Sequence, residues 1–314
     1  MQFLGGEATR ERLPFAALVG ALRAMFEQGC ELPPRQVLEL APAASDGVTS
    51  LVMPAWQRGG CYGVKVVNIA PGNAARGLPG LHSTYMLYDA TTGVPLAWLD
   101  GDEITARRTA ATSALAASWL ARPDARRLAI IGAGRVARLL AEAHRVCRPI
   151  ERVTVWARSP ARATALVDEL AGQGFLARTA QSIEDALVDA DIVSCATLAR
   201  EPIVHGKWLR AGSHLDLIGS FAPAMREADD DCFAGATIVV DSDDAATKSG
   251  DLIGPIARGV LDAGAIATLA ELARGHRRGR SADDERTVFK SVGSALEDLA
   301  AAILVHRPDA QGEG

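Results

Sequence analysis

The spacing of apolar residues in the first third of the chain predicts a helix followed by an antiparallel sheet. Apolar residues recur at helical spacing from Phe15 to Cys30. Four short segments of strand character follow, and glycine, proline and asparagine separate them, which is typical of strands joined by tight turns. These segments are Val48–Trp56, Gly63–Ala70, His82–Ala90 and Val94–Gly101. A helix rich in alanine, serine and threonine is then predicted over Thr105–Ala121, with Thr105 as its N-cap and Pro123 just past its end.

From Arg127 onward the pattern changes to an alternation of strands and helices. The strand RLAIIGAG leads into a helix that ends near Val146, and the strand RVTVWARS leads into the helical stretch PARATALVDELAGQG. Such alternation predicts crossover units and a parallel sheet covered on both faces. The later elements predicted by the pattern are strands over Asp191–Thr197, Ser213–Ser220 and Thr237–Ser242, and a last helix over Glu285–Val305.

Composition narrows the classes of function. A chain of 314 residues exceeds what one core usually supports, so we expect two domains. The excess of 38 acidic over 33 basic residues argues against nucleic-acid binding. The longest stretch without charged residues, Thr109–Ala121, is too short to cross a bilayer. Five scattered cysteines without a C-x-x-C pair, and an N-terminus without a long apolar run, favour a cytoplasmic protein without disulfides.

The strand RLAIIGAG ends in a glycine-rich turn suited to a dinucleotide. Gly132 allows a tight turn, Gly134 leaves room for a pyrophosphate, and Ala137 lets the next helix pack close to the sheet. The surrounding strand–helix–strand order is the one that this fingerprint requires. The alternative is a tight turn of small residues that binds no ligand.

The end of the second strand of this unit bears on the choice of dinucleotide. An NAD-selective site usually has an acidic residue there, which binds the ribose 2′-hydroxyl. This chain has Ala157-Arg158-Ser159 instead, and a guanidinium beside a hydroxyl suits a 2′-phosphate. The sequence therefore favours NADPH, with NADH as the alternative. In the other interpretation, Arg158 is simply a solvated arginine.

Candidate substrate-binding residues lie in the first third of the chain. Alternation places Lys65 on one strand face with Gly63, Val67 and Ile69, and an edge-strand lysine is the interpretation favoured by the residues alone. Arg107 and Arg108 point about 100° apart on a helix, so at most one is expected to face inward. His82 is either a proton donor or a strand histidine satisfied by its neighbours. The histidine spacings indicate no metal site.

Taken together, the motifs resemble those of the ornithine cyclodeaminase/mu-crystallin family, in family order over roughly residues 30–300. The matching segments are Val52-Met53-Pro54, Gly63–Asn68 with Pro71 and Asn73, Arg108–Ala114, Gly132-Ala133-Gly134, Gly219-Ser220 with Pro223 and Arg226-Glu227, and Val240-Asp241-Ser242 with Gly250-Asp251-Leu252. The resemblance implies a homodimer of two-domain α/β protomers. A Rossmann-type doubly wound parallel sheet would span residues 119–286. An α+β substrate-binding and dimerisation domain would comprise residues 1–118, to which residues 287–314 return.

The resemblance also assigns roles to individual residues. Lys65 matches a substrate-facing lysine, Arg108 matches the arginine that holds the substrate carboxylate, and Arg35 matches a second carboxylate-binding arginine. His82 is a weaker candidate than Lys65 for relaying a proton. The residues expected to bind the cofactor are Thr109, Gly132, Gly134, Arg135, Val136, Ala157, Arg158, Ser159, Thr197, Ser220 and Ser291.

One departure from the family pattern decides the expected reaction. Ornithine cyclodeaminases have a catalytic aspartate in a G-G-D-x-P segment, whereas this chain has Gly219-Ser220-Phe221-Ala222-Pro223. A phenyl ring cannot accept a proton. We therefore expect an NADPH-dependent ketimine reductase that converts Δ1-pyrroline-2-carboxylate and Δ1-piperideine-2-carboxylate to L-proline and L-pipecolate. The alternatives are an ornithine cyclodeaminase, an alanine-dehydrogenase-like oxidoreductase and a non-catalytic NADPH-binding protein.

Overall fold

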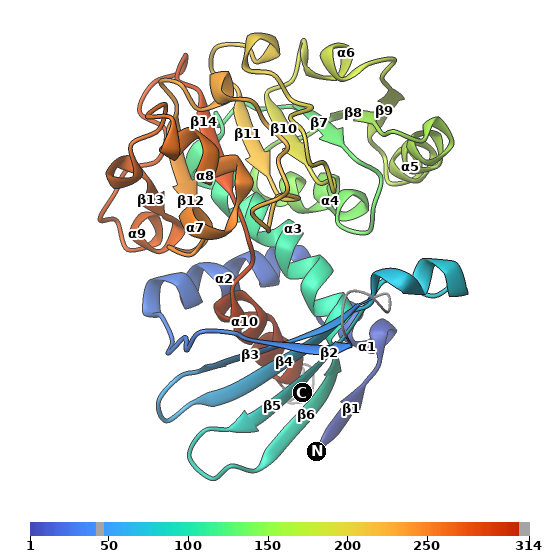
Figure 1. The fold of residues 1–314 in the computed structure, drawn as a ribbon, viewed down its shortest axis with the longest axis vertical. Helices are drawn as coiled ribbons and strands as arrows, with labels where there is room; N and C mark the ends of the chain where they lie inside the picture. The colour runs from blue at the N-terminus through green and yellow to red at the C-terminus, as the bar shows by residue number, and fades with distance from the viewer. Residues whose placement is uncertain (42–46, 308–314) are drawn as a thin grey trace, which may run out of the picture. The chain divides into compact units, whose positions relative to one another are not determined.

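The computed structural model describes residues 1–41 and 47–307, which form two compact units (Figure 1). Unit 1 comprises Met1–Arg108 and the C-terminal segment from Ala295, and unit 2 comprises Thr109–Ser294. The domain boundaries expected from the sequence, 118/119 and 286/287, stay a prediction.

Within the described residues, unit 1 is built on a six-stranded sheet in the order β1-β6-β5-β4-β3-β2. The strands are β1 (Gln2–Leu4), β2 (Gln36–Ala41), β3 (Val48–Trp56), β4 (Cys61–Ile69), β5 (Leu81–Asp89) and β6 (Pro95–Asp100). Neighbouring strands are antiparallel, as expected, except that β1 runs parallel to β6. The helices of this unit are α1 (Gly6–Glu11), α2 (Phe15–Gln28) and α10 (Ala295–His306). Helix α10 contacts four strands, β3 to β6, and also packs against α2.

Unit 2 holds a parallel sheet whose described strands follow the order β13-β12-β14-β11-β10-β7-β8-β9. The strands are β7 (Arg127–Ile131), β8 (Arg152–Trp156), β9 (Leu176–Thr179), β10 (Ile192–Cys195), β11 (His214–Leu217), β12 (Thr237–Val240), β13 (Ala267–Thr268) and β14 (Thr287–Lys290). The chain order reverses between β7 and β10, which makes this a doubly wound sheet of Rossmann type and confirms the expected fold class. The α-helices of the unit are α4 (Ala137–Cys147), α5 (Pro160–Gly172), α6 (Ile183–Leu187), α7 (Ala245–Lys248), α8 (Gly250–Ala257) and α9 (Leu269–Ala273).

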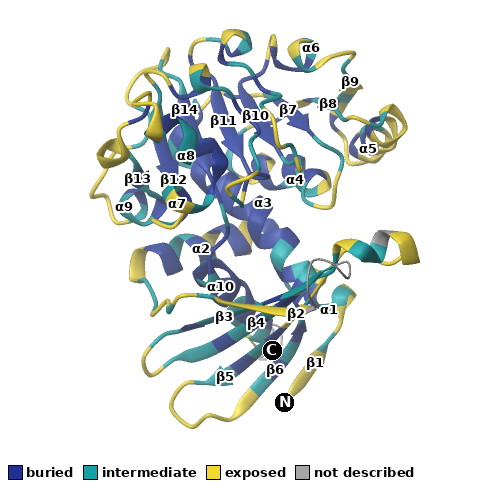
Figure 2. Cartoon of the chain, viewed as in Figure 1, coloured by how far each residue is buried: buried dark blue, intermediate teal, exposed yellow. Residues whose placement is uncertain are grey.

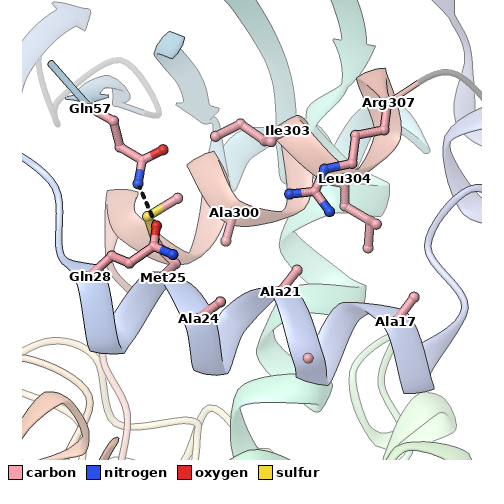
Figure 3. A pocket seen from close by; sticks show the side chains of 11 residues that line it. Ala17, Ala21, Ala24, Met25, Gln28, Gln57, Ala300, Ile303, Leu304 and Arg307 are labelled. Atoms are coloured by element: carbon pink, nitrogen blue, oxygen red, sulfur yellow. Dashed lines mark hydrogen bonds between the residues drawn. The ribbon is translucent and has the colours of Figure 1, made fainter. Parts of the chain in front are cut away.

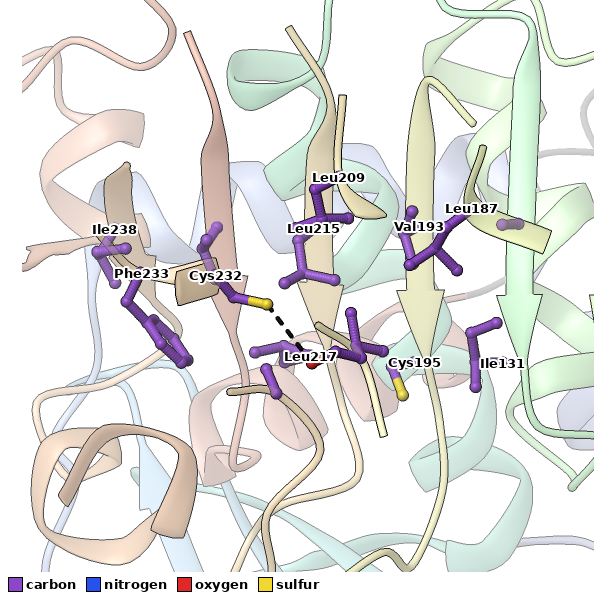
Figure 4. Packing of buried hydrophobic residues seen from close by; sticks show 14 of the residues in the cluster. Ile131, Leu187, Val193, Cys195, Leu209, Leu215, Leu217, Cys232, Phe233 and Ile238 are labelled. Carbon is purple, nitrogen blue, oxygen red and sulfur yellow. Dashed lines mark hydrogen bonds between the residues drawn. The ribbon is translucent and has the colours of Figure 1, made fainter. Parts of the chain in front are cut away.

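Apolar side chains of the central strands form the core of unit 2 (Figure 4). Ile131, Val193 and Leu215 project from β7, β10 and β11 on the face of the sheet that α6 also covers. Cys232, from a 3-10 turn, belongs to this cluster and donates a weak hydrogen bond from Sγ to the Val204 carbonyl at 3.6 Å. Because the strands of this sheet are parallel, their carboxyl ends lie at one edge of the sheet.

The structure corrects two elements expected from the sequence. The helix that contains Thr105 is α3 (Gly101–Leu120), and it begins one turn earlier than expected. The Asp100 carboxylate accepts a hydrogen bond from the Glu103 amide at 2.8 Å, so Asp100 caps this helix instead of Thr105. Figure 2 shows that α3 is buried along most of its length.

The expected last helix over Glu285–Val305 is wrong in its first part. Thr287–Lys290 form β14, a strand buried between β11 and β12, and only α10 is helical. A strand with both faces buried lacks the alternation that marks a half-exposed strand. No helix among the described residues is long and apolar enough to cross a membrane.

Candidate functional site

Lys65 lies in the middle of β4, an interior strand, where it pairs with Met53 of β3 and Tyr85 of β5. Its side chain is only 2% exposed, so the expectation of an edge-strand lysine is wrong. The Nζ atom lies 2.7 Å from Oδ2 of Asp298 and donates to Oγ1 of Thr105 at 3.3 Å. A buried ammonium requires such partners, because the low dielectric of the interior disfavours an isolated charge.

Arg108 joins the same group of charges from α3. Its Nη1 lies 2.5 Å from Oε2 of Glu297, and its Nε donates to Oδ1 of Asp298 at 2.9 Å. We call these four residues the charge cluster: Lys65, Arg108, Glu297 and Asp298. All of them belong to unit 1, and all have buried side chains.

Arg107 is buried as well, contrary to the expectation that at most one of the two arginines faces inward. Its Nε donates to the Leu13 carbonyl at 2.8 Å, and its guanidinium lies 4.2 Å from the centre of the Phe15 ring. The two arginines leave the helix in different directions, as expected, but each direction is covered by another part of unit 1.

Burial and charge set the proton affinities of the charge cluster. Desolvation lowers the pKa of Lys65 from 10.5 to about 8, against the opposing effect of the Asp298 carboxylate. Burial acts to raise the pKa of Asp298, but the charges of Lys65 and Arg108 outweigh it and hold that pKa below its ordinary value. A lysine with a pKa near 8 is mostly charged at neutral pH and can still release its proton to a basic substrate.

Arg35 and His82 stand elsewhere in unit 1. Arg35 is half-buried and immediately precedes β2, whose first residue pairs with Val52 of β3. His82 lies on β5, where it pairs with Asn68 of β4, and its side chain is exposed. Because side chains alternate along a strand, His82 lies on the opposite face of the sheet from Lys65. The structure therefore does not bring His82 to the charge cluster.

A pocket of about 360 Å³ lies between α2 and α10 (Figure 3). Small and aliphatic side chains, among them Ala21, Ala24 and Ile303, line most of it, and Arg307 is the one charged residue among the described residues that line it. The paired cations of the charge cluster are not part of this lining. Among residues 1–41 and 47–307, no group of three or more His, Cys, Asp or Glu side chains could hold a metal ion.

The glycine-rich turn of unit 2 has the backbone that a dinucleotide requires. Gly132 has a φ of 122°, and a Cβ there would lie 2.5 Å from the Ala196 carbonyl oxygen, so only glycine fits. A Cβ on Gly134 would meet no atom within 4 Å, so this position opens onto free space. Helix α4 begins just beyond, at Ala137, and its first amides can bind an anion.

A hollow of about 310 Å³ adjoins this turn at the carboxyl ends of β7, β8 and β10. Of the residues expected to bind the cofactor, it brings together Gly132, Gly134, Ala157, Arg158, Ser159 and Thr197. The other residues that line it are Ala133, Trp156, Arg162, Ala196, Leu198, Ala199 and Ile203. Arg158 and Arg162 are the only charged residues among the described residues of this lining.

The other expected cofactor residues do not line this hollow. Arg135 and Val136 lie at the start of α4, and Thr109 is buried on α3. Ser220 follows β11 and is fully buried, and its hydroxyl donates to the Met225 carbonyl at 2.5 Å. Ser291 follows β14, and its amide donates to the Leu217 carbonyl at 3.1 Å. Ser220 and Ser291 nevertheless share the carboxyl edge of the sheet with the hollow.

Glu227 is a buried residue of unit 2 to which sequence reasoning gave no role. Its Oε1 accepts hydrogen bonds from the amide and the hydroxyl of Thr197, each at 2.7 Å, and its Oε2 accepts one from the Gly219 amide at 2.7 Å. It thereby ties together the loops that follow β10 and β11. Burial raises the pKa of Glu227, and the charge of Lys290 opposes that rise.

Asp251 and Lys290 lie beside Glu227, and Asp251 holds the Glu227 backbone in place. Asp251 Oδ1 accepts from the Glu227 amide at 2.8 Å, and its other oxygen lies 3.6 Å from Nζ of Lys290. Both side chains are fully buried. Lys290 could have been singled out from the sequence, since it is one of only four lysines in the chain and follows three residues of strand character. Glu297 and Asp298 likewise stand out as adjacent acids in an apolar helix.

Comparison with known proteins identifies relatives over almost the whole chain. The model of the ornithine cyclodeaminase/mu-crystallin family matches residues 7–312. A Paracoccus denitrificans protein named Delta(1)-pyrroline-2-carboxylate reductase is 42% identical over 310 residues, which cover 98% of this chain and 96% of the relative.

Two solved structures share the fold. The Thermococcus litoralis Delta(1)-pyrroline-2-carboxylate reductase in complex with NADH and L-proline matches with a TM-score of 0.91 and 34% identity, over 98% of this chain and 96% of that one. An archaeal alanine dehydrogenase dimer with bound NAD matches with a TM-score of 0.90 and 30% identity, over 98% of this chain and 95% of that one.

Proposed function

Because the chain belongs to the ornithine cyclodeaminase/mu-crystallin family, we propose that it reduces cyclic imino acids with NAD(P)H as the hydride donor. The substrates would be Δ1-pyrroline-2-carboxylate and Δ1-piperideine-2-carboxylate, and the products L-proline and L-pipecolate. The relative from Paracoccus denitrificans carries the name of this activity, and the Thermococcus litoralis enzyme was solved with NADH and L-proline. The protein is an oxidoreductase that acts on C=N bonds.

The charge cluster supports binding of the substrate carboxylate. A guanidinium has five N–H donors in a planar fork that matches a carboxylate, and Arg108 engages Glu297 and Asp298 through Nη1 and Nε. We propose that Arg108 binds the substrate carboxylate, as its match to the family's carboxylate-binding arginine implies. Arg35, the second arginine that the resemblance assigns to this carboxylate, lies outside the charge cluster, just before β2. Glu297 and Asp298 act as positioning residues, because they fix the orientation of the two cations.

Lys65 supplies the proton chemistry. Hydride adds most readily to a protonated C=N bond, and a pKa near 8 lets the Lys65 ammonium donate a proton to the imine nitrogen or hold the substrate carboxylate in place. Its short contact with Asp298 keeps Nζ at a fixed point. His82 lies on the other face of the sheet, so we assign the proton to Lys65.

The turn at Gly132–Gly134 and the adjoining hollow fit a dinucleotide. Gly132 and Gly134 would hold the pyrophosphate, and Arg158 and Ser159 the ribose that carries a 2′-phosphate in NADPH. Ser220 and Ser291 would lie toward the nicotinamide. When bound, the reduced nicotinamide supplies the hydride. We propose NADPH as the preferred cofactor, with NADH as a weaker one.

The residue that favours reduction over cyclodeamination is Phe221. It follows β11, is 49% exposed, and belongs to a segment, Gly219–Pro223, without any carboxylate. Ornithine cyclodeaminases of this family have an aspartate there, and ammonia release from a diamino acid needs such a base. Glu227, the first acid after this segment, accepts hydrogen bonds from the amides of Thr197 and Gly219.

The test is to mix the purified protein with NADPH or NADH and each cyclic imino acid, and separately with L-ornithine and NAD⁺. Consumption of NADPH with the imino acids, and no ammonia from L-ornithine, is the expected result. Ammonia release from L-ornithine would show a cyclodeaminase. Oxidation of NADH with pyruvate and ammonia, but not with the imino acids, would favour the alanine-dehydrogenase alternative, for which the archaeal neighbour is the supporting observation.

Two variants test the assignment of the substrate site. Lys65→Met and Arg108→Leu should each lower kcat/KM for the imino acid by about 100-fold or more, since each removes an interaction worth about 3 kcal/mol in a buried setting. NADPH affinity should change less than about threefold. Near-normal turnover of either variant would show that the substrate binds elsewhere.

We also propose that the protein acts as a cytoplasmic homodimer. The edge strand β2 exposes the apolar side chains Val37, Leu38 and Leu40, a row typical of a subunit interface. The five cysteines are free thiols, as a reducing compartment requires. Size-exclusion chromatography with light scattering tests the dimer, and a monomer at micromolar concentration would contradict it.

A further inference from the structure

The hollow beside the glycine-rich turn carries a second arginine that sequence reasoning left without a role. Arg162 stands in the first turn of α5, four residues after Arg158, and both side chains line the hollow. Both are exposed, and neither guanidinium has a hydrogen bond or ion pair with another side chain among the described residues. Ser159 precedes the helix, and its side chain makes no capping hydrogen bond.

The charges around this spot have one sign. Within the part of the chain that the structure describes, none of the residues that line the hollow is acidic. Helix α5 also has no acidic residue in its first turn, although the positive end of the helix dipole favours one there. Two arginines that share a hollow with a helix N-terminus make this spot electropositive. Such a spot favours an anionic ligand.

We propose that Arg162 and Arg158 together clamp the 2′-phosphate of NADPH, and that Arg162 sets the preference for NADPH over NADH. This inference rests on the proposed NAD(P)H dependence and makes it specific. A phosphomonoester carries a charge of about −1.5 to −2 at neutral pH, which two guanidiniums can match and one cannot. Side chains in the first turn of a helix lean toward its N-terminus, which directs Arg162 toward Ser159 and the end of β8.

The absence of an acid from the lining points the same way. An NAD-selective site usually has a carboxylate that accepts from the ribose 2′-hydroxyl, and the described residues that line the hollow include none. Loss of Arg162 should therefore harm NADPH binding selectively and give NADH no new partner.

The experiment measures dissociation constants of the full chain for NADPH and NADH, without imino acid, by quenching of tryptophan fluorescence. Arg162→Gln should weaken NADPH binding about 10- to 100-fold, as expected for a lost charge-assisted contact, and change NADH binding less than about threefold. On the unchanged protein, adenosine 2′,5′-bisphosphate should compete with NADPH more strongly than adenosine 5′-phosphate does. The ratio of their two inhibition constants should be about equal to the ratio of the dissociation constants for NADPH and NADH. Arg162→Gln should remove most of that difference.

Arg152→Gln is the matched control, because Arg152 is an exposed arginine at the opposite, amino end of β8. It should leave both constants unchanged. Arg162→Lys, which keeps the charge but not the fork, should lie between the unchanged protein and Arg162→Gln. An equal loss of NADPH and NADH affinity in Arg162→Gln, or no loss of either, would overturn the clamp.

The binding experiment separates this inference from the proposed function. Selective NADPH binding that depends on Arg162, without turnover of any imino acid, supports the clamp and contradicts the reductase. Turnover of imino acids that uses NADPH and NADH equally well, before and after Arg162→Gln, supports the reductase and contradicts the clamp.

Discussion

Replacing Lys65 with methionine should change how the stability of the protein depends on pH. Methionine has nearly the length of the lysine stem but no charge. In the folded protein, burial lowers the pKa of the Lys65 ammonium from 10.5 to about 8. At 1.36 kcal/mol per pKa unit, the folded state disfavours the charged form by about 3 kcal/mol at neutral pH.

The sign of the effect follows from the lowered pKa. Between about pH 8 and pH 10.5 the unfolded chain keeps the Lys65 proton while the folded protein releases it. The free energy of unfolding of the unchanged protein should therefore rise with pH in this window, relative to that of Lys65→Met. From pH 7 to pH 9.5 the difference should shift by roughly 2 kcal/mol in favour of the unchanged protein.

Urea unfolding followed by circular dichroism at several pH values measures this difference. Lys207→Met serves as the control, since Lys207 is exposed and the substitution is the same. Its stability relative to the unchanged protein should not depend on pH in this range. A difference between Lys65→Met and the unchanged protein that stays constant from pH 7 to pH 9.5 would refute the argument, because Lys65 would then titrate as it does in the unfolded chain.

Other expectations concern the cofactor edge and the reaction. Gly132→Ala should destabilise the protein by about 2 kcal/mol or more, because the φ of 122° at Gly132 and the nearby carbonyl oxygen exclude a Cβ. Gly134→Ala should leave the melting temperature unchanged and still weaken NADPH binding, because a Cβ there meets no protein atom. Equal effects of the two variants on melting temperature and on NADPH binding would contradict these roles. Glu227→Ala should cost about 3 kcal/mol or more in urea unfolding, and Glu227→Gln less, since glutamine keeps an acceptor for the loop amides. kcat/KM for the imino acid should fall above about pH 8 as Lys65 loses its proton, and a flat pH profile would exclude Lys65 as the proton donor.

The parallel half of the fold could be predicted from the sequence because its signals are local. Gly132 and Gly134 follow an apolar strand directly, and each crossover helix is close in sequence to the strands that it connects. The carboxyl-edge residues Arg158 and Thr197 could be placed for the same reason. Arg162 was missed because it follows the strand-end motif by several residues and looks like one of many surface arginines.

The charge cluster was predictable only in part. The alternation in β4 gave the correct face for Lys65, but the strand pattern could not show whether β4 lies at an edge or in the interior. Its burial depends on β3 and β5 on either side and on α10, which supplies Asp298 from the far end of the chain. The strand β14 was read as helix, because its four residues run straight into a strongly helical pattern.

The discontinuity of unit 1 has a consequence for the order in which a nascent chain can fold. In the sequence, residues 109–294 separate the two cations, Lys65 and Arg108, from the carboxylates of Glu297 and Asp298 that neutralise them. During synthesis both cations leave the ribosome long before α10 does, so this core cannot close until translation is nearly finished. The continuous segment of unit 2 is under no such constraint and can fold first.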